Sequence, residues 1–243
     1  MNITTKPFEY KDGKTTCVGY LAWDETYADP KPCVLVGHAW GGCDGFAQSK
    51  AVQMAAQGYV GIAIDVYGDG KTGAGPEENE ALMTPFINDR KMLLKRLKAA
   101  VKAAKALEQV DATALAMMGY CFGGLCALDL ARSGVDLKAA ISFHGLFNGN
   151  GLPPKKIKAS VLALHGWDDP MVPPAAVTEL GIELTKAKCD WQIHAYGDTK
   201  HAFMVEGAND PKNGIQYNAV AERRAWAAAL DLLAEKFDLH GVG

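Results

Sequence analysis

The amino-acid sequence predicts an α/β fold with a doubly wound, mostly parallel sheet and helices on both faces. Short apolar segments rich in β-branched residues alternate along the chain with longer segments whose apolar residues recur at helical spacing. Alternating strands and helices build parallel sheets, because each helix returns the chain to the same end of the sheet. No internal repeat or low-complexity linker interrupts the 243 residues. We therefore expect a single α/β domain over residues 1–243.

The first half of the chain predicts two strands and two or three helices. Residues 33–38 (CVLVGH) and 58–68 (GYVGIAIDVYG) have the composition of buried parallel strands. Residues 44–57, between them, have helical spacing. Residues 77–108 are rich in Leu, Lys, Ala and Arg and lack glycine. They predict one long helix, or two with a break near Pro85.

The alternation continues in the second half. The predicted elements are a strand at 113–120, a helix at 123–134, strands at 138–145 and 159–166, a helix at 174–187, a strand at 189–197 and a helix at 217–237. Two segments with breaker and turn residues, 76–85 and 207–218, are expected to pass over the carboxyl edge of the sheet. Ligands bind at that edge in open parallel sheets. Because such folds host many activities, the function depends on individual residues.

Composition and charge exclude several classes of partner. Hydrophobic residues make up 49% and charged residues 22% of the chain, and the net charge of −3 gives no electrostatic reason to bind nucleic acid or an anionic membrane. No run approaches the roughly 18 apolar residues of a membrane-spanning helix. The first residues lack the layout of a signal peptide. We expect a cytoplasmic protein, monomeric or homodimeric, whose partner is a small molecule.

Six cysteines are spread along the chain: Cys17, Cys33, Cys43, Cys121, Cys126 and Cys189. Without a signal peptide they do not indicate a disulfide framework. No C-x-x-C pair or H-E-x-x-H motif occurs, so neither a metal site nor a cofactor is expected. Most of these cysteines are predicted to be small buried hydrophobic residues.

The stretch Gly119–Gly124 (GYCFGG) is the exception. It has the pattern G-x-nucleophile-x-G, with Cys121 at the nucleophile position, where an apolar strand gives way to a helix. Glycines suit this turn because a Cβ beside the nucleophile would collide with neighbouring backbone. The start of a helix also favours a negative charge, which stabilises a thiolate. The alternative is a buried cysteine in a glycine-rich turn, but the strand-to-helix position favours a nucleophile.

A nucleophile needs a base and an acid that orients the base, and on this fold the chain order is nucleophile, acid, histidine. The segment GWDDPMVP places Asp168 and Asp169 after a strand, although acidic residues are also common in turns. His201 follows the next strand. Cys121, Asp169 and His201 thus have the required order and can meet at one sheet edge.

Five other histidines compete with His201 for the role of base. They are His38, His144, His165, His194 and His240. His144 and His165 are expected to pack near strand ends with hydrogen bonds to neighbours. His38 heads a glycine-rich loop, His194 lies within a strand pattern and His240 lies in the tail. Only His201 follows both other candidates and lies in a loop.

The oxyanion formed by nucleophilic attack needs two N–H donors. One is expected from Phe122, the residue after the nucleophile, and one from the loop at 37–45 (GHAWGGCDG). Either Ala39 or Trp40 can supply the second, and we favour Trp40. The alternative for the Trp40 side chain is a lid on the core.

With these residues identified, the chain resembles the dienelactone hydrolase family of α/β-hydrolases. The resemblance rests on GYCFGG, GWDDPMVP and HAF at His201, with PCVLVGHAWGG and GYVGIAIDVYG matching in type and position. It covers about residues 10–238. It implies a single domain that cleaves enol-lactones or related esters without a cofactor. By position it makes Cys121 the nucleophile, His201 the base, and Asp169, rather than Asp168, the orienting acid.

Two positions depart from the family's best-known members. Those members carry a glutamate that holds and activates the thiol where this chain has Ala39. They also carry an arginine that pairs with the substrate carboxylate where this chain has Val205. Loss of that arginine removes the attraction for a small dianionic lactone. With Trp40, Phe122 and Phe203, these positions predict an apolar pocket for a neutral ester, lactone or thioester.

Two other functions fit the same cysteine motif. Glutaminase-like thiol amidases also use a G-x-C-x-G turn, but they typically follow their histidine with x-Glu, whereas this chain has HAF. A non-catalytic, redox-responsive protein would use an exposed thiol at Cys121 as an oxidant sensor. The missing glutamate at Ala39 adds weight to this second alternative, but the hydrolase stays the preferred interpretation.

Overall fold

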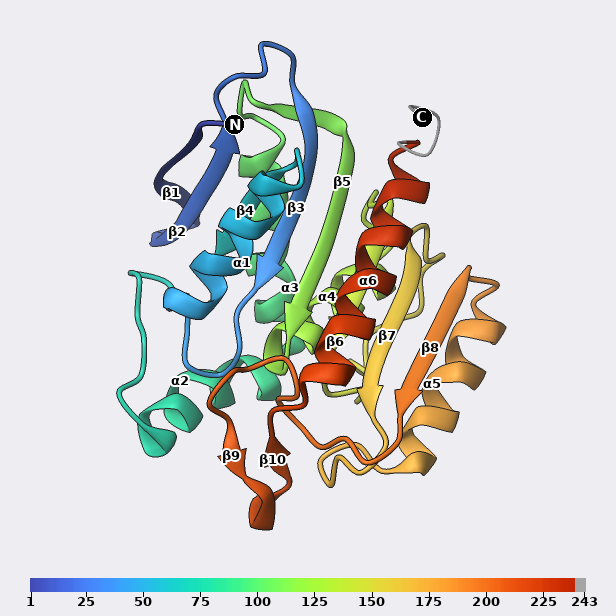
Figure 1. The fold of residues 1–243 in the computed structure, drawn as a ribbon. Helices are drawn as coiled ribbons and strands as arrows, with labels where there is room; N and C mark the ends of the chain where they lie inside the picture. The colour runs from blue at the N-terminus through green and yellow to red at the C-terminus, as the bar shows by residue number, and fades with distance from the viewer. Residues whose placement is uncertain (239–243) are drawn as a thin grey trace.

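The computed structural model describes residues 1–238 as one eight-stranded sheet with helices on both faces (Figure 1). The strands are β1 Ile3–Asp12, β2 Thr15–Asp24, β3 Lys31–Gly37, β4 Val60–Ile64, β5 Val110–Tyr120, β6 Ala139–Phe143, β7 Ser160–Gly166 and β8 Trp191–Tyr196. The helices are α1 Gly45–Ala56, α2 Pro76–Asn88, α3 Arg90–Ala104, α4 Phe122–Arg132, α5 Pro174–Lys186 and α6 Ala219–Lys236. The predicted fold class is confirmed. His240 lies outside the described residues.

The strand order places a topological switch point at β3. The order is β1-β2-β4-β3-β5-β6-β7-β8; the strands from β3 to β8 are parallel, and β2 is antiparallel to both of its neighbours, β1 and β4. Strand β3 lies between β4 and β5, so the chain leaves β3 toward one side and later returns on the other. Loops diverge at such a switch point and leave room for a ligand. The loops after β3 and β5 carry Trp40 and Cys121.

Two apolar layers cover the sheet. Val34 and Val36 belong to a layer that includes buried residues of α1 and α6, whereas Cys33 and Leu35 belong to the layer under α3, α4 and α5. This alternation follows from the two-residue period of a strand. All residues of β4 and β6 are buried, which explains their continuous apolar sequences. Figure 1 shows α6 in front of the sheet and α4 behind it.

The first two strands were not predicted. β1 and β2 form an antiparallel hairpin whose turn contains Gly13 in the left-handed region, with φ 61°. Every second residue near the end of β1 is buried, at Phe8, Tyr10 and Asp12. The intervening residues are exposed and mostly charged, because β1 is an edge strand. That composition obscured the strand in the sequence.

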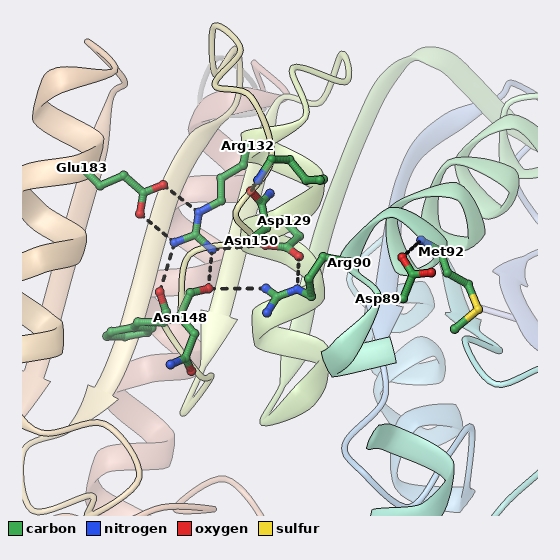
Figure 2. A network of polar contacts seen from close by, with 10 residues as sticks. Asp89, Arg90, Met92, Asp129, Arg132, Asn148, Asn150 and Glu183 are labelled. Atoms are coloured by element: carbon green, nitrogen blue, oxygen red, sulfur yellow. Dashed lines mark hydrogen bonds and ion pairs between the residues drawn. The ribbon is translucent and has the colours of Figure 1, made fainter. Parts of the chain in front are cut away.

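The boundary between helices α2 and α3 differs from the predicted one. The predicted break near Pro85 falls instead at Asp89, because α2 continues through Pro85 to Asn88. The Asp89 carboxylate accepts a hydrogen bond from the Met92 N–H at 2.9 Å and so caps the start of α3 (Figure 2). Segment 76–85 is thus helical, and it lies beside the loop after β3, where Gly73 donates to Gly41.

The crossover from β6 to β7 has no helix. Residues 144–159 are irregular, and two arginines from helices hold this loop (Figure 2). Arg132 donates to the carbonyls of Phe147 and Asn148 at 3.1 and 3.2 Å and pairs with Glu183 through both carboxylate oxygens. The buried Asp129 carboxylate accepts from Arg132 and from Arg90. This network substitutes for the packing that a crossover helix would provide.

The predicted excursion at 207–218 is confirmed. It forms a small hairpin of β9 Asn209–Asp210 and β10 Ile215–Gln216, joined by a short 3₁₀ turn at Pro211–Asn213. The hairpin extends past the carboxyl ends of the strands in Figure 1. Ile215 forms a bridge with His201. Within residues 1–238, no helix has the length and apolar character needed to cross a membrane.

Candidate active site

Cys121 occupies a strained turn between β5 and α4. Its backbone has φ 54° and ψ −114°, a conformation that few residues other than glycine adopt and that clusters at functional sites. Its N–H donates to the Phe143 carbonyl at 3.1 Å, and its own carbonyl accepts from the N–H of Gly124 at 3.0 Å. Its side chain is half-buried. The turn therefore holds the thiol at the first turn of a helix, with access to solvent.

The glycines around Cys121 are sterically required. A Cβ at Gly119 would lie 2.1 Å from the Gly123 carbonyl oxygen, and one at Gly123 would lie 2.1 Å from the Gly37 carbonyl oxygen. At Gly124 a Cβ would lie 2.5 Å from Ser142 Oγ. These contacts are far shorter than van der Waals distances. The predicted steric need for glycine on both sides of the cysteine is confirmed.

The other five cysteines differ from Cys121 in their surroundings. All six cysteines are free thiols. Cys17, Cys33, Cys43 and Cys126 are buried, and burial raises the pKa of each of these thiols. Burial also raises the pKa of the half-buried Cys189, to about 11. The prediction that most cysteines are buried hydrophobic residues is confirmed.

Asp169 and His201 form a buried pair. Nδ1 of His201 lies 2.7 Å from Oδ2 of Asp169, and the residues are 3% and 2% exposed. The other oxygen of Asp169 accepts from the Met171 N–H at 2.8 Å. The His201 backbone is held on both sides, because its N–H donates to Gly214 and its carbonyl accepts from Gln216. The carboxylate thus fixes the orientation and tautomer of the imidazole.

Asp168, the alternative acid, has a different role. One of its carboxylate oxygens accepts a hydrogen bond from the Thr199 N–H at 3.2 Å, and its own N–H donates to the Thr199 carbonyl at 2.9 Å. Asp168 is exposed, unlike its buried neighbour. Asp168 therefore links the turn after β7 to the turn after β8. Of the two acids, it is Asp169 that contacts His201.

The second ring nitrogen of His201, Nε2, is not engaged by Asp169, which contacts Nδ1. It has no hydrogen-bond partner among residues 1–238. Burial alone would lower the pKa of His201, but the electrostatic effect of Cys121 and the contact with Asp169 outweigh it and raise the pKa to about 10. The sulfur therefore lies within electrostatic reach of the ring, although the two form no well-aligned hydrogen bond. Catalytic hydrogen bonds are often this loose in a free enzyme.

His144 and His165 correct a prediction. Both are buried near strand ends as expected, but neither ring nitrogen of either residue finds a hydrogen-bond partner in the described part of the chain. Burial lowers the pKa of both rings, and for His144 the protonated His201, 5.1 Å away between ring centres, lowers it further. Both are therefore neutral neighbours of His201. Aromatic packing rather than hydrogen bonding holds them.

The two predicted oxyanion donors, Phe122 and Trp40, lie in the segments that follow β5 and β3. Phe122 is the first residue of α4, so its N–H has no helical acceptor. Trp40 lies in the loop after β3, and its carbonyl accepts from the Tyr67 hydroxyl at 2.7 Å. The contact between Gly37 and Gly123 holds this loop against the start of α4. Sequence reasoning missed Tyr67 because residues 58–68 were expected to form one strand, whereas β4 ends at Ile64 and Tyr67 lies in the loop that follows.

The predicted pocket residues have different environments. Ala39 and Val205 are partly exposed, whereas Phe203 is fully buried and packs against His144 and Tyr196. The Phe122 side chain is also fully buried. Ala39 and Val205 bring no charge to the site. Contact of Phe203 with a substrate stays a prediction.

Comparisons with known proteins agree on one family. Residues 18–237 match the model of the dienelactone hydrolase family. A Yersinia pestis protein whose name includes carboxymethylenebutenolidase is 28% identical over 92% of this chain and 84% of its own length. The solved structure of a dienelactone hydrolase-like promiscuous phosphotriesterase from metagenomic libraries is 33% identical, covers 98% of this chain and 100% of its own, and superposes with a TM-score of 0.90.

Proposed function

This chain belongs to the dienelactone hydrolase family, whose members hydrolyse lactone and ester bonds, and we propose that it does so with Cys121, His201 and Asp169. Cys121 is the nucleophile, His201 transfers protons and Asp169 orients His201. No residue role in this proposal requires a cofactor. The substrate is a neutral carboxylic ester or lactone.

One observation carries the proposal. A cysteine held in a strained turn at a helix start influences, through its charge, a histidine that is already bound to a buried carboxylate. Buried structural cysteines have no such partners. Perturbed titration in a group of this composition is typical of a catalytic site.

The first half of the reaction forms a thioester. The Sγ electron pair attacks the carbonyl carbon, and the carbonyl oxygen becomes an oxyanion that accepts hydrogen bonds from the N–H groups of Phe122 and Trp40. The carbon–oxygen bond to the leaving group then breaks. The proton on Nε2 of His201 passes to the leaving alkoxide, so the imidazole becomes neutral.

The second half of the reaction depends on a fall in the pKa of His201. Among the effects that raise the pKa of His201, the charge of Cys121 is the largest. Acylation removes that charge, so the pKa of His201 falls and the neutral imidazole can accept a proton from water. The resulting hydroxide attacks the thioester, the carbon–sulfur bond breaks, and the thiolate–imidazolium pair returns.

The absence of a cation at Val205 supports a neutral substrate. An arginine at that position would attract a carboxylate, and a valine offers only apolar contact. Ala39 is likewise uncharged. The site therefore lacks, at these two positions, the charges that would select a dianionic lactone.

Intact-protein mass spectrometry tests the proposal. After brief exposure to p-nitrophenyl acetate and a panel of neutral lactones, we expect an acyl adduct that maps to Cys121 and disappears in Cys121→Ala. Turnover should vanish in both Cys121→Ala and His201→Ala. Equal residual rates in wild type and both variants would refute catalysis and favour a redox-responsive role for the thiol.

A further inference from the structure

We propose that His38 and Tyr67 are positioning residues that fix the direction of the Trp40 N–H. The inference rests on the proposed function, in which this N–H binds the oxyanion. Neither side chain is expected to touch the substrate. They act on the two peptide groups that flank Trp40.

His38 is fully buried and both of its ring nitrogens are engaged. Nε2 accepts from the Val66 N–H at 3.2 Å, and Nδ1 lies 2.6 Å from the Ala39 carbonyl oxygen. A carbonyl can only accept and an N–H can only donate, so Nδ1 carries the proton. Burial lowers the pKa of His38, which keeps the ring neutral. One tautomer therefore satisfies both contacts.

The Ala39 carbonyl belongs to the same peptide group as the Trp40 N–H. This peptide is trans, so its C=O and N–H point in opposite directions. The Gly42 N–H donates to the same carbonyl oxygen at 3.2 Å. Because two donors hold the oxygen on one side, the Trp40 N–H is directed to the other side.

Tyr67 holds the next peptide group. Its hydroxyl donates to the Trp40 carbonyl at 2.7 Å. Its ring packs edge-on against His38, with centroids 4.7 Å apart, and stacks on Phe122 at 5.9 Å. The same side chain thus contacts the loop with one predicted oxyanion donor and the residue that supplies the other. Rotation of either peptide group beside Trp40 would break the hydrogen bond to the Ala39 carbonyl or the one to the Trp40 carbonyl.

The loop after β4 is itself rigid, so Val66 and Tyr67 are fixed reference points. The fully buried Asp65 carboxylate accepts from the N–H groups of Val18, Gly68 and Gly70 at 2.8 to 2.9 Å. The Val66 carbonyl accepts from Arg96 at 2.8 Å. The hydrogen bonds of His38 and Tyr67 therefore connect the loop that carries Trp40 to a rigid loop in the core.

His38 also lies directly against the start of α4. A Cβ at Gly123 would come within 2.8 Å of the His38 carbonyl oxygen, and the rings of His38 and Phe122 are 6.0 Å apart. The loop that carries Trp40 and the helix that begins at Phe122 are thus packed together. His38 fixes the loop at the point of contact.

Two substitutions at His38 separate positioning from packing. His38→Leu removes both hydrogen bonds, whereas His38→Gln offers an amide N–H and a carbonyl oxygen in their place. For p-nitrophenyl acetate we expect kcat to fall between about 10- and 100-fold in His38→Leu with KM changed less than about threefold, less than the roughly 100- to 1,000-fold effect of deleting an oxyanion donor. His38→Gln should recover most of kcat and keep the wild-type pH profile, since the neutral His38 contributes no ionisation to it.

Tyr67→Phe tests the second contact without disturbing the fold. It removes only the hydroxyl that binds the Trp40 carbonyl, and we expect kcat to fall about 3- to 30-fold at nearly constant KM. Tyr59→Phe is the matched control, because Tyr59 is also buried but precedes β4 at the opposite edge of the sheet. It should leave kcat unchanged.

The outcomes are distinguishable from failure of the proposed function. Wild-type kcat in both His38→Leu and Tyr67→Phe would overturn the inference, as would a His38→Gln variant that folds but is as slow as His38→Leu. If His38→Leu does not fold, the kcat values of Tyr67→Phe and His38→Gln still test whether His38 and Tyr67 position Trp40. Hydrolysis that survives Cys121→Ala would instead refute the proposed function.

Discussion

Nδ1 of His201 and Oδ2 of Asp169 lie 2.7 Å apart, although 32 positions separate the two residues in the chain. The carboxylate follows β7 and the histidine follows β8, which pair in parallel. The contact therefore depends on the register of two strands rather than on local sequence. Its consequences for catalysis can be measured.

Removing the Cys121 sulfur should lower the pKa of His201. In the intact protein Cys121 and Asp169 together raise that pKa to about 10 against the opposing effect of burial. In Cys121→Ala the carboxylate alone opposes burial, so the ring should lose its proton at a lower pH. NMR titration of ring-labelled histidine measures the change. A value that stays near 10 would show that the sulfur does not contribute.

Asp169→Asn should slow hydrolysis, with Asp168→Asn as control. The amide weakens the orientation of His201 and its stabilisation as a cation. The roughly 10,000-fold loss for this change in a serine triad is an upper limit, because in the proposed mechanism the charge of Cys121 also stabilises the imidazolium. Asp168→Asn should change kcat less than about threefold. Steady-state kinetics on p-nitrophenyl acetate measures both, and equal losses would contradict the assignment of Asp169.

Val205→Arg should shift selectivity toward anionic lactones. The guanidinium would add a partner for a substrate carboxylate next to the site. The ratio of kcat/KM for an anionic lactone to that for a matched neutral lactone should rise about tenfold or more. Val205→Met serves as a control for size. An unchanged ratio would refute the argument for a neutral substrate.

Gly119→Ala should destabilise the fold. The added methyl group would lie 2.1 Å from the Gly123 carbonyl oxygen, so β5 and α4 would have to separate. We expect the free energy of unfolding to fall by about 3 kcal/mol or more. Gly45→Ala is the control, since a Cβ there meets nothing within 4 Å, and should change it by less than about 0.5 kcal/mol. Urea unfolding measures both.

Asp129→Ala should also lower stability, through the crossover loop. It leaves Arg90 and Arg132 without the carboxylate between them (Figure 2), and removing one partner of a buried ion pair costs about 3–5 kcal/mol. Asp136→Ala, which breaks the exposed pair with Lys158, should cost less than about 1 kcal/mol. Similar losses in the two variants would contradict a structural role for the buried network.

The sequence by itself determined the alternation of strands and helices and the candidates for a nucleophile, an acid and a base. Each of these depends on short patterns: continuous apolar runs for β4 and β6, and glycines beside Cys121. Such patterns are visible because buried strands and tight turns constrain residues next to one another. The catalytic roles of Cys121, Asp169 and His201 stay predictions for experiment.

Only the tertiary structure decided features that depend on residues far apart. The edge hairpin of β1 and β2 was not predicted, because exposed charged residues alternate with the buried ones near the end of β1. The isolation of the His144 and His165 rings, and the bonds from His38 and Tyr67 to the peptides beside Trp40, follow from packing across several strands. Hydrogen bonds between distant segments depend on three-dimensional position, which no local pattern encodes.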